Sequence, residues 1–179
     1  MTRPLHERHA LITGAGSGIG AAIALALAQQ GCRLTLMGRS LERLETQAQR
    51  LREHVAQVKV EIVSVDVSDM VQVQSAVSQA QERAGAVHIL INNAGLAAGF
   101  DFLNEANSDD WNRMIDTNIK GLLYVSRAVL PGMVAKRLVA EALTRGSDDN
   151  ITVVVAFLKP FATLETAWSA ADAAQGGAA

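Results

Sequence analysis

A glycine-rich segment near the amino terminus contains the residue types that bind phosphate groups. It reads Thr13-Gly14-Ala15-Gly16-Ser17-Gly18-Ile19-Gly20 and lies between a short apolar run and a longer helical pattern. Gly14 permits a tight turn, Gly18 lets the backbone approach a pyrophosphate, and Gly20 allows close packing of helix on strand. A helix that begins here presents free N–H groups and the positive end of its dipole to the phosphates. The segment predicts a dinucleotide site, with an ordinary flexible turn as the alternative.

The residues after the second strand-like run indicate which dinucleotide is bound. A site for NAD has an acidic side chain there, which binds the adenosine ribose hydroxyls. This chain has Gly38, Arg39 and Ser40 instead. Arg39 can pair with a 2′-phosphate, and no carboxylate is present to repel that phosphate, so the sequence favours NADP over NAD. The alternative is that Arg39 is only a solvated residue at the end of the strand.

Hydrophobic periodicity predicts the elements that position these residues. We expect strands at residues 9–13, 33–37, 59–65 and 88–92. We expect helices at residues 18–30, 40–54, 70–84 and 108–130, the last with Ser108 as its N-cap and with Pro131 and Gly132 as an interruption. Short strands that alternate with longer helices are typical of the α/β class, and right-handed crossovers then give a Rossmann-type, doubly wound parallel sheet with helices on both faces.

The chain beyond this alternation predicts one more helix and one more strand. The helix covers residues 133–144, and the strand covers residues 151–158, which end at Lys159-Pro160. We therefore expect about five strands in a sheet that is incomplete in its carboxyl-terminal half. The expected parts are a dinucleotide-binding half at 1–136 and a helix-strand tail at 137–179. The tail either adds a fifth strand to the sheet or packs outside it.

Composition limits the classes of function. The 179 residues are 49% hydrophobic, which is enough for one sizeable core, and the net charge of -2 argues against nucleic acid and anionic membranes as partners. Cys32 is the only cysteine, so an intramolecular disulfide and a cysteine-rich metal site are excluded. No signal-peptide pattern and no apolar run of about 20 residues is present. We expect a cytoplasmic protein without a membrane partner.

Three further motifs accompany the glycine-rich segment, and together they make residues 5–136 resemble the short-chain dehydrogenase/reductase family. They are Asp66-Val67 after the third strand, Asn92-Asn93-Ala94-Gly95 after the fourth, and Asn118 in the following helix. The resemblance implies an NAD(P)-dependent carbonyl or alcohol oxidoreductase. It implies that Asp66 contacts the adenine, that residues 92–95 line the cofactor cleft and brace the sheet, and that Asn118 supports a water-linked proton relay.

The resemblance also implies a set of cofactor-binding residues, with Asn118 as the one implied catalytic residue. In the family, the helix that carries this asparagine commonly forms a subunit interface, so a homo-oligomer is implied. The expected cofactor-binding residues are Thr13, Gly14, Gly16, Ser17, Gly18, Ile19, Gly20, Arg39, Asp66, Val67, Asn92, Asn93, Ala94 and Gly95.

The Tyr-x-x-x-Lys pair that serves this family in acid–base catalysis has no counterpart in the chain. Tyr124 is the only tyrosine, and residue 128 is an alanine. Lys120 lies four residues before Tyr124 on one helix face, but two elements before the family's catalytic helix, so we expect Tyr124 to pack and Lys120 to be solvated. The family also has a catalytic serine after its fifth strand. Thr163 is a candidate substitute for it only because it follows the candidate fifth strand.

The motifs present and the catalytic residues missing together predict an NADP-binding protein of oxidoreductase type with weak or no oxidoreductase activity. The alternatives are an active oxidoreductase, an NADP-binding module without catalysis, and a nonfunctional hybrid or truncated chain.

Residues 137–158 resemble a second family, the carboxyl-terminal end of type 2C metal-dependent Ser/Thr protein phosphatases. In that family a helix, a Gly-Ser turn and an Asp-Asn pair lead into a core strand, and Asp149 matches a metal ligand. A hard divalent ion needs several oxygen ligands from different elements, and the rest of that family's motifs are missing. We therefore expect no metal site and no phosphatase activity, with Asp148 and Asp149 capping a turn.

Overall fold

The computed structural model describes residues 5–134, which form a parallel sheet covered by helices on both faces. Its four strands lie in the order β3-β2-β1-β4. They are β1 (His9–Thr13), β2 (Arg33–Gly38), β3 (Val60–Ser64) and β4 (Ile89–Ile91). β1 pairs in parallel with both β2 and β4, so the chain reverses its direction of strand addition beside β1. Ligands of open α/β sheets bind at such a reversal, at the carboxyl ends of the strands.

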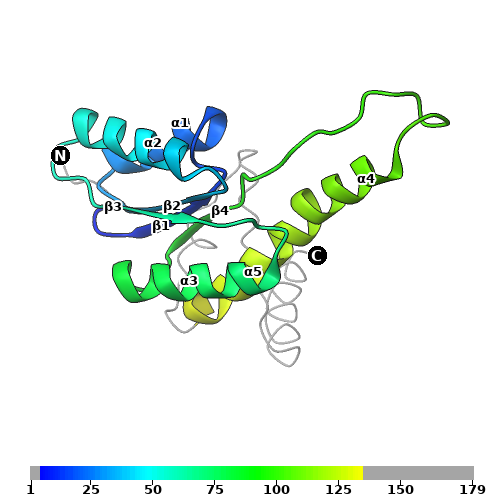
Figure 1. Cartoon of the computed structure of the whole chain (residues 1–179). Helices are drawn as coiled ribbons and strands as arrows, with labels where there is room; N and C mark the ends of the chain where they lie inside the picture. Colours follow the sequence, from blue (N-terminus) through cyan, green and yellow to red (C-terminus); the bar gives the residue numbers. More distant parts are fainter. Residues whose placement is uncertain (1–4, 135–179) are drawn as a thin grey trace, which may run out of the picture.

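Two helix pairs bury the two faces of the sheet (Figure 1). α1 (Gly18–Gln29) and α2 (Leu41–His54) cover one face, where β1 contributes Ala10 and Ile12 to the core. α3 (Met70–Ala84) and α5 (Leu122–Val134) cover the other face, where β1 contributes Leu11. Successive side chains of a strand point to opposite faces, so a strand buried on both sides is an apolar run without alternation. The predicted Rossmann-type fold is confirmed.

The fourth helical region differs from its prediction at its start. α4 (Ser108–Met114) begins one residue after its cap, because the side chain of Asn107 accepts a hydrogen bond from the N–H of Asp109 at 2.9 Å. The expected N-cap Ser108 is therefore wrong. Asn107 has extended backbone angles, as a capping residue must, whereas Ser108 is already helical. Both residue types cap helices well, so composition did not distinguish them.

The fourth helical region continues beyond α4 without a break, through a π-helical segment that is wider than an α-helix. α4 leads into a π-helical segment, η1 (Ile115–Gly121), and then into α5. The expected interruption at Pro131 and Gly132 is wrong, because α5 includes Pro131 and runs to Val134. A proline inside a helix costs about 3 kcal/mol. The burial of Val129 and Met133 in the core beneath the sheet offsets that cost.

The predicted tail at 137–179, with its helix and its strand at 151–158, lies outside the described residues. The fifth strand, the phosphatase-like turn at Asp149 and the position of Thr163 therefore stay predictions. Within residues 5–134, no helix is both long enough and apolar enough to cross a membrane.

Candidate functional site

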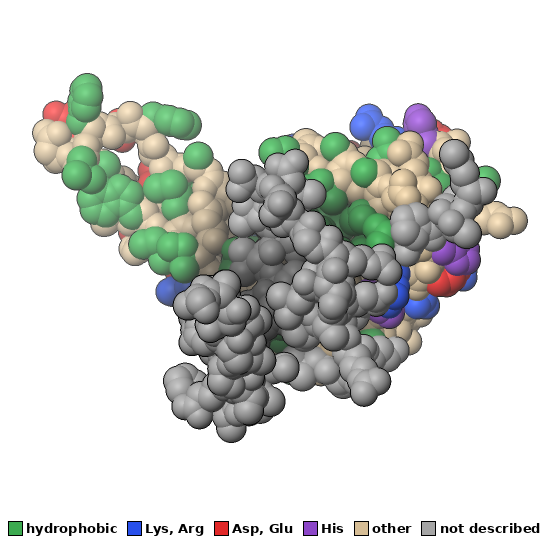
Figure 2. All heavy atoms as spheres, turned by 180° about the vertical axis from the view of Figure 1, so that it is seen from behind, with side chains coloured by type: hydrophobic (Ala, Val, Ile, Leu, Met, Phe, Trp, Pro, Cys, Tyr) green, Lys and Arg blue, Asp and Glu red, His purple; other side chains and the backbone are tan. Residues whose placement is uncertain are grey.

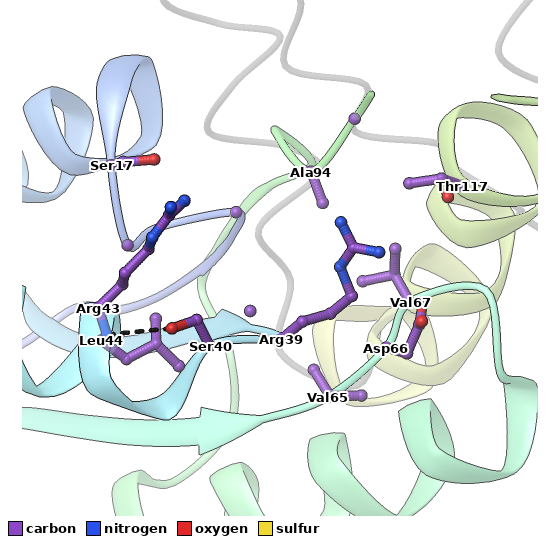
Figure 3. A pocket seen from close by; sticks show the side chains of 14 residues that line it. Ser17, Arg39, Ser40, Arg43, Leu44, Val65, Asp66, Val67, Ala94 and Thr117 are labelled. Carbon is purple, nitrogen blue, oxygen red and sulfur yellow. Dashed lines mark hydrogen bonds between the residues drawn. The ribbon is translucent and has the colours of Figure 1, made fainter. Parts of the chain in front are cut away.

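An open cleft of about 200 Å³ lies where β1, β2 and β3 end (Figure 3). Its walls come from the turn after β1, the start of α2, the segment after β3, the segment after β4, and η1. The residues that line it are Gly14, Gly16, Ser17, Gly38, Arg39, Ser40, Arg43, Leu44, Val65, Asp66, Val67, Ala94, Gly95 and Thr117. The cleft therefore brings together the glycine-rich segment and the motifs after the second, third and fourth strands.

The glycine-rich turn is closed on its sheet side and open on its solvent side. Gly14 has φ +65°, and a Cβ there would lie 2.9 Å from the Cα of Ala94. A Cβ on Gly20 would overlap the carbonyl oxygen of Gly14 and lie 2.5 Å from Nδ2 of Asn93. Gly18, with φ +55°, has no atom within 4 Å of its Cβ position. The turn thus packs tightly against the sheet while Gly18 leaves its backbone open to a ligand.

The amino terminus of α1 is open to an anion. The N-cap residue Ser17 makes no side-chain capping bond, and the first turn holds no acidic residue. In α2 and α3, by contrast, Ser40 and Asp69 accept hydrogen bonds from N–H groups of the first turn. The first N–H groups of a helix have no partner inside it, and its dipole favours negative charge at this end. The geometry of α1 fits the pyrophosphate of a dinucleotide.

Two guanidinium groups stand over the cleft, and the sequence analysis identified only one of them. Arg39 extends from the end of β2 into the space between the segments after β3 and β4, and Arg43 extends from α2 toward Ser17 (Figure 3). Within residues 5–134 neither side chain has a hydrogen bond or an ion pair. Asp66 is the one carboxylate among the lining residues, so the cleft carries a net positive charge.

Asp66 is held in place by its own turn. Its Oδ1 accepts from the N–H of Ser68 at 3.0 Å and from the hydroxyl of Ser68 at 2.7 Å. Its N–H donates to Oε1 of Gln72 at 3.3 Å. Since both contacts of the carboxylate use Oδ1, Oδ2 is available to accept a hydrogen bond from a ligand. An exocyclic amine such as that of adenine is a donor of the required kind.

Thr13 and Asn93 join the ends of β1 and β4. The Thr13 hydroxyl oxygen accepts from the N–H groups of Asn93 and Ala94, both at 3.0 Å. The Asn93 amide donates to the carbonyl oxygens of Thr13 and Gly14, both at 3.1 Å. These bonds fix the glycine-rich turn against the segment after β4. Both residues support the cleft from behind rather than line it.

Asn118 holds the chain just beyond the cleft. Its Oδ1 accepts from the N–H of Leu96 at 2.8 Å, and its Nδ2 donates to the carbonyl oxygen of Leu96 at 2.8 Å. Both ends of the amide are therefore committed to one backbone unit next to Gly95. Asn92 turns away from the cleft, donates to the Ser126 hydroxyl at 3.0 Å, and leaves its buried Oδ1 without a partner.

Lys120 and Tyr124 each have another contact in the structure. Lys120 Nζ is paired with Asp116 Oδ1 at 2.7 Å, and this contact raises the pKa of Lys120. Tyr124 packs against the core beneath the sheet. These contacts agree with the expected packing of Tyr124 and with the expected exposed position of Lys120.

The cleft is lined by six residues outside the predicted cofactor-binding set, namely Gly38, Ser40, Arg43, Leu44, Val65 and Thr117. Arg43 stands in the first turn of α2, three residues after Ser40, and that short spacing from the end of β2 was a usable signal. Thr117 immediately precedes Asn118, but its position depends on the wide turn of η1, which no sequence period indicates. Of the predicted residues, Thr13, Gly18, Ile19, Gly20, Asn92 and Asn93 adjoin the cleft without lining it.

Comparison with known proteins identifies one family. The short chain dehydrogenase family matches residues 8–147. An uncharacterized oxidoreductase of Staphylococcus saprophyticus is 43% identical over 129 residues, which are 72% of this chain and 54% of that protein. The family match continues eleven residues past residue 136, into the segment that the sequence analysis assigned to a separate tail.

Solved structures of similar fold bind both forms of the nicotinamide cofactor. L-Sorbose reductase from Gluconobacter frateurii, complexed with NADPH and L-sorbose, is 32% identical with a TM-score of 0.70, over 75% of this chain and 51% of that chain. An NAD+-bound xylitol dehydrogenase is 31% identical with a TM-score of 0.71, over 74% of this chain and 50% of that chain. This chain thus spans about half the length of the proteins that it matches.

Proposed function

The chain belongs to the short chain dehydrogenase family, and on that premise we propose that it binds NADP(H) in the cleft at the carboxyl ends of its strands. The pyrophosphate lies at the amino terminus of α1, and Oδ2 of Asp66 accepts from the adenine. Arg39 and Arg43 bind the 2′-phosphate. Bound NADP(H) supplies the capacity to exchange a hydride with a carbonyl or alcohol carbon.

The observation that carries the preference for NADP is the two guanidinium groups over the cleft, that of Arg39 just after β2 and that of Arg43 in the first turn of α2. The side chains of Arg39 and Arg43 have no partner within residues 5–134, and both residues line the cleft. An NAD site has a carboxylate at this position, which accepts from the ribose hydroxyls. Here a cation takes its place, so a 2′-phosphate gains charge-assisted hydrogen bonds that NAD cannot form.

Isothermal titration of NADP and NAD tests this assignment. A hydrogen bond to a charged group is worth about 1.5–3 kcal/mol, so Arg39→Gln and Arg43→Gln should each weaken NADP binding roughly 10- to 150-fold and leave NAD binding nearly unchanged. Arg50→Gln is the matched control, because Arg50 is exposed on the same helix and does not line the cleft. Equal losses for NADP and NAD would contradict the role of the arginines, and no binding of either at millimolar concentration would refute the proposal.

We further propose that the chain holds the nucleotide without completing hydride transfer. Its only tyrosine is Tyr124, and no lysine follows it at position 128. The experiment is absorbance at the nicotinamide band with NADPH and a panel of carbonyl compounds, for which no turnover is expected. Turnover that disappears in Arg39→Glu would instead support an active oxidoreductase.

A homo-oligomer is also proposed, because the helix that carries Asn118 exposes an apolar stripe. The stripe consists of Trp111, Ile115, Ile119 and Leu123, spaced by four residues and 38–57% exposed. Figure 2 shows hydrophobic side chains on the projecting part of the molecule that contains α4 and the loop before it. Exposed apolar rows of this kind are typical of contact surfaces between proteins. Sedimentation velocity of the whole chain measures the assembly.

A further inference from the structure

The π-helical segment η1 faces the cleft on one side and the apolar stripe on the other. Thr117 lines the cleft, whereas Ile115 and Ile119 are 45% and 55% exposed. These three residues lie within five positions of one another. Any ligand that contacts Thr117 and any partner that covers the two isoleucines therefore act on the same turn of helix.

Two more contacts join η1 to the walls of the cleft. Asn118 binds both backbone groups of Leu96, and the Cβ position of Gly95 lies 3.3 Å from Oδ1 of Asn118. A Cβ on Gly121 would lie 2.7 Å from Cγ2 of Val67, so this end of η1 packs directly on the segment after β3. A shift of η1 cannot leave either wall unchanged.

The hydrogen-bond pattern of the π-helical turn makes η1 the place in this helix for such a shift. It replaces i→i−4 hydrogen bonds with i→i−5 bonds, is rare, and occurs mostly at functional sites. Helix shifts of 1–2 Å at subunit interfaces are an established form of allosteric change. Resting on the NADP(H) site proposed above, we propose that η1 couples nucleotide binding to the association of two copies of this chain through the apolar stripe.

The pattern of side chains along the helix favours a second copy as the occupant of the stripe. Its four apolar residues are spaced evenly, so an antiparallel copy places Ile115 opposite Ile119 and Trp111 opposite Leu123. Beside them, Asp116 and Lys120 are paired with each other at 2.7 Å within one copy, so these two charges cancel and do not repel a second copy. A self-complementary surface is what a two-fold dimer requires.

Coupling between two sites is reciprocal, which sets the expected result. If association tightens nucleotide binding, nucleotide must tighten association by the same free energy. Couplings of this kind commonly amount to about 5- to 150-fold in an equilibrium constant. Saturating NADP should thus lower the dissociation constant of the dimer at least about five-fold, and the affinity for NADP should rise with protein concentration.

The experiment combines sedimentation of the whole chain, with and without NADP, with titration of NADP at several protein concentrations. Leu123→Glu places a charge on the part of the stripe outside η1. This variant should be a monomer whose affinity for NADP is weaker and is the same at every protein concentration. Val71→Glu is the control, because Val71 is 71% exposed on α3 and belongs to neither surface, and it should behave as the original chain.

The outcomes separate the two proposals. A chain that binds NADP but stays monomeric, or forms a dimer whose dissociation constant NADP leaves unchanged, overturns the coupling and leaves the nucleotide site standing. Absence of NADP binding in all variants refutes the proposed function itself. Unfolding curves of the variants confirm that each is folded before it is compared.

Discussion

Replacing Thr13 by valine tests how the ends of β1 and β4 are joined. Valine has nearly the same shape as threonine but no hydroxyl. The Thr13 hydroxyl oxygen accepts from two backbone N–H groups at 3.0 Å, those of Asn93 and Ala94, and the residue is 2% exposed. Thr13→Val therefore leaves two donors without their acceptor in a part-buried place.

The expected loss follows from the number of orphaned donors. A buried donor without a partner costs about 1–3 kcal/mol, and since these groups are only part-buried, we expect about 2–4 kcal/mol for the two together. Thr13→Ser keeps the hydroxyl and removes one methyl group, which costs about 1 kcal/mol. For a domain of this size each kcal/mol lowers the melting temperature by about 4 °C.

Urea unfolding followed by circular dichroism measures both variants. We expect the valine variant to lose at least twice the free energy of unfolding that the serine variant loses. A valine variant as stable as the serine variant would refute the reasoning, because the stabilisation would then reside in packing of the methyl group rather than in the two hydrogen bonds.

Three further predictions concern the sheet, the glycine-rich turn and η1. Burial lowers the pKa of His9 in the folded chain. Below the ordinary histidine pKa of about 6.5 the unfolded chain therefore binds a proton more readily than the folded chain, and the free energy of unfolding should fall as the pH falls. Urea midpoints at pH 7.5 and pH 5 should differ more for the original chain than for His9→Gln. The Gly20→Ala variant should unfold at a much lower urea concentration than the Gly18→Ala variant, because a Cβ at residue 20 meets other atoms and a Cβ at residue 18 does not. Equal urea midpoints would contradict the packing described for the turn. Asn118→Ala should speed amide exchange at Leu96, whose N–H it binds, and unchanged exchange there would show that the amide contact is unimportant.

Much of the fold was predictable because local patterns and global packing agree. Leu11 and Ile12 are adjacent yet face different cores, so their strand appears as an unbroken apolar run. The glycine-rich turn was predictable because Gly14 and Gly20 occupy positions where no other residue fits.

The residues of the cleft that the sequence did not predict depend on how the helices are placed, and no single residue type indicates that placement. A π-helical turn differs from an α-helical turn by one hydrogen-bond step, and the sequence of η1 is compatible with both, so the position of Thr117 was not predictable. Arg43 was absent from the predicted set, although its short spacing from the end of β2 placed it near the carboxyl ends of the strands. The fold shows that α2 begins at the cleft and that Arg43 lines it.

The central place of β1 has a consequence for how precisely the cleft is built. All five residues of β1 are buried, and the strand is paired on both sides, whereas β3 and β4 each have one paired neighbour among the described strands. Local opening requires breaking both ladders, so β1 amides should be among the last to exchange with deuterium. The glycine-rich turn starts at the final residue of this strand. The glycine-rich turn is therefore anchored to a strand that is paired on both sides, and Gly18 is a position of the turn with open space around its Cβ.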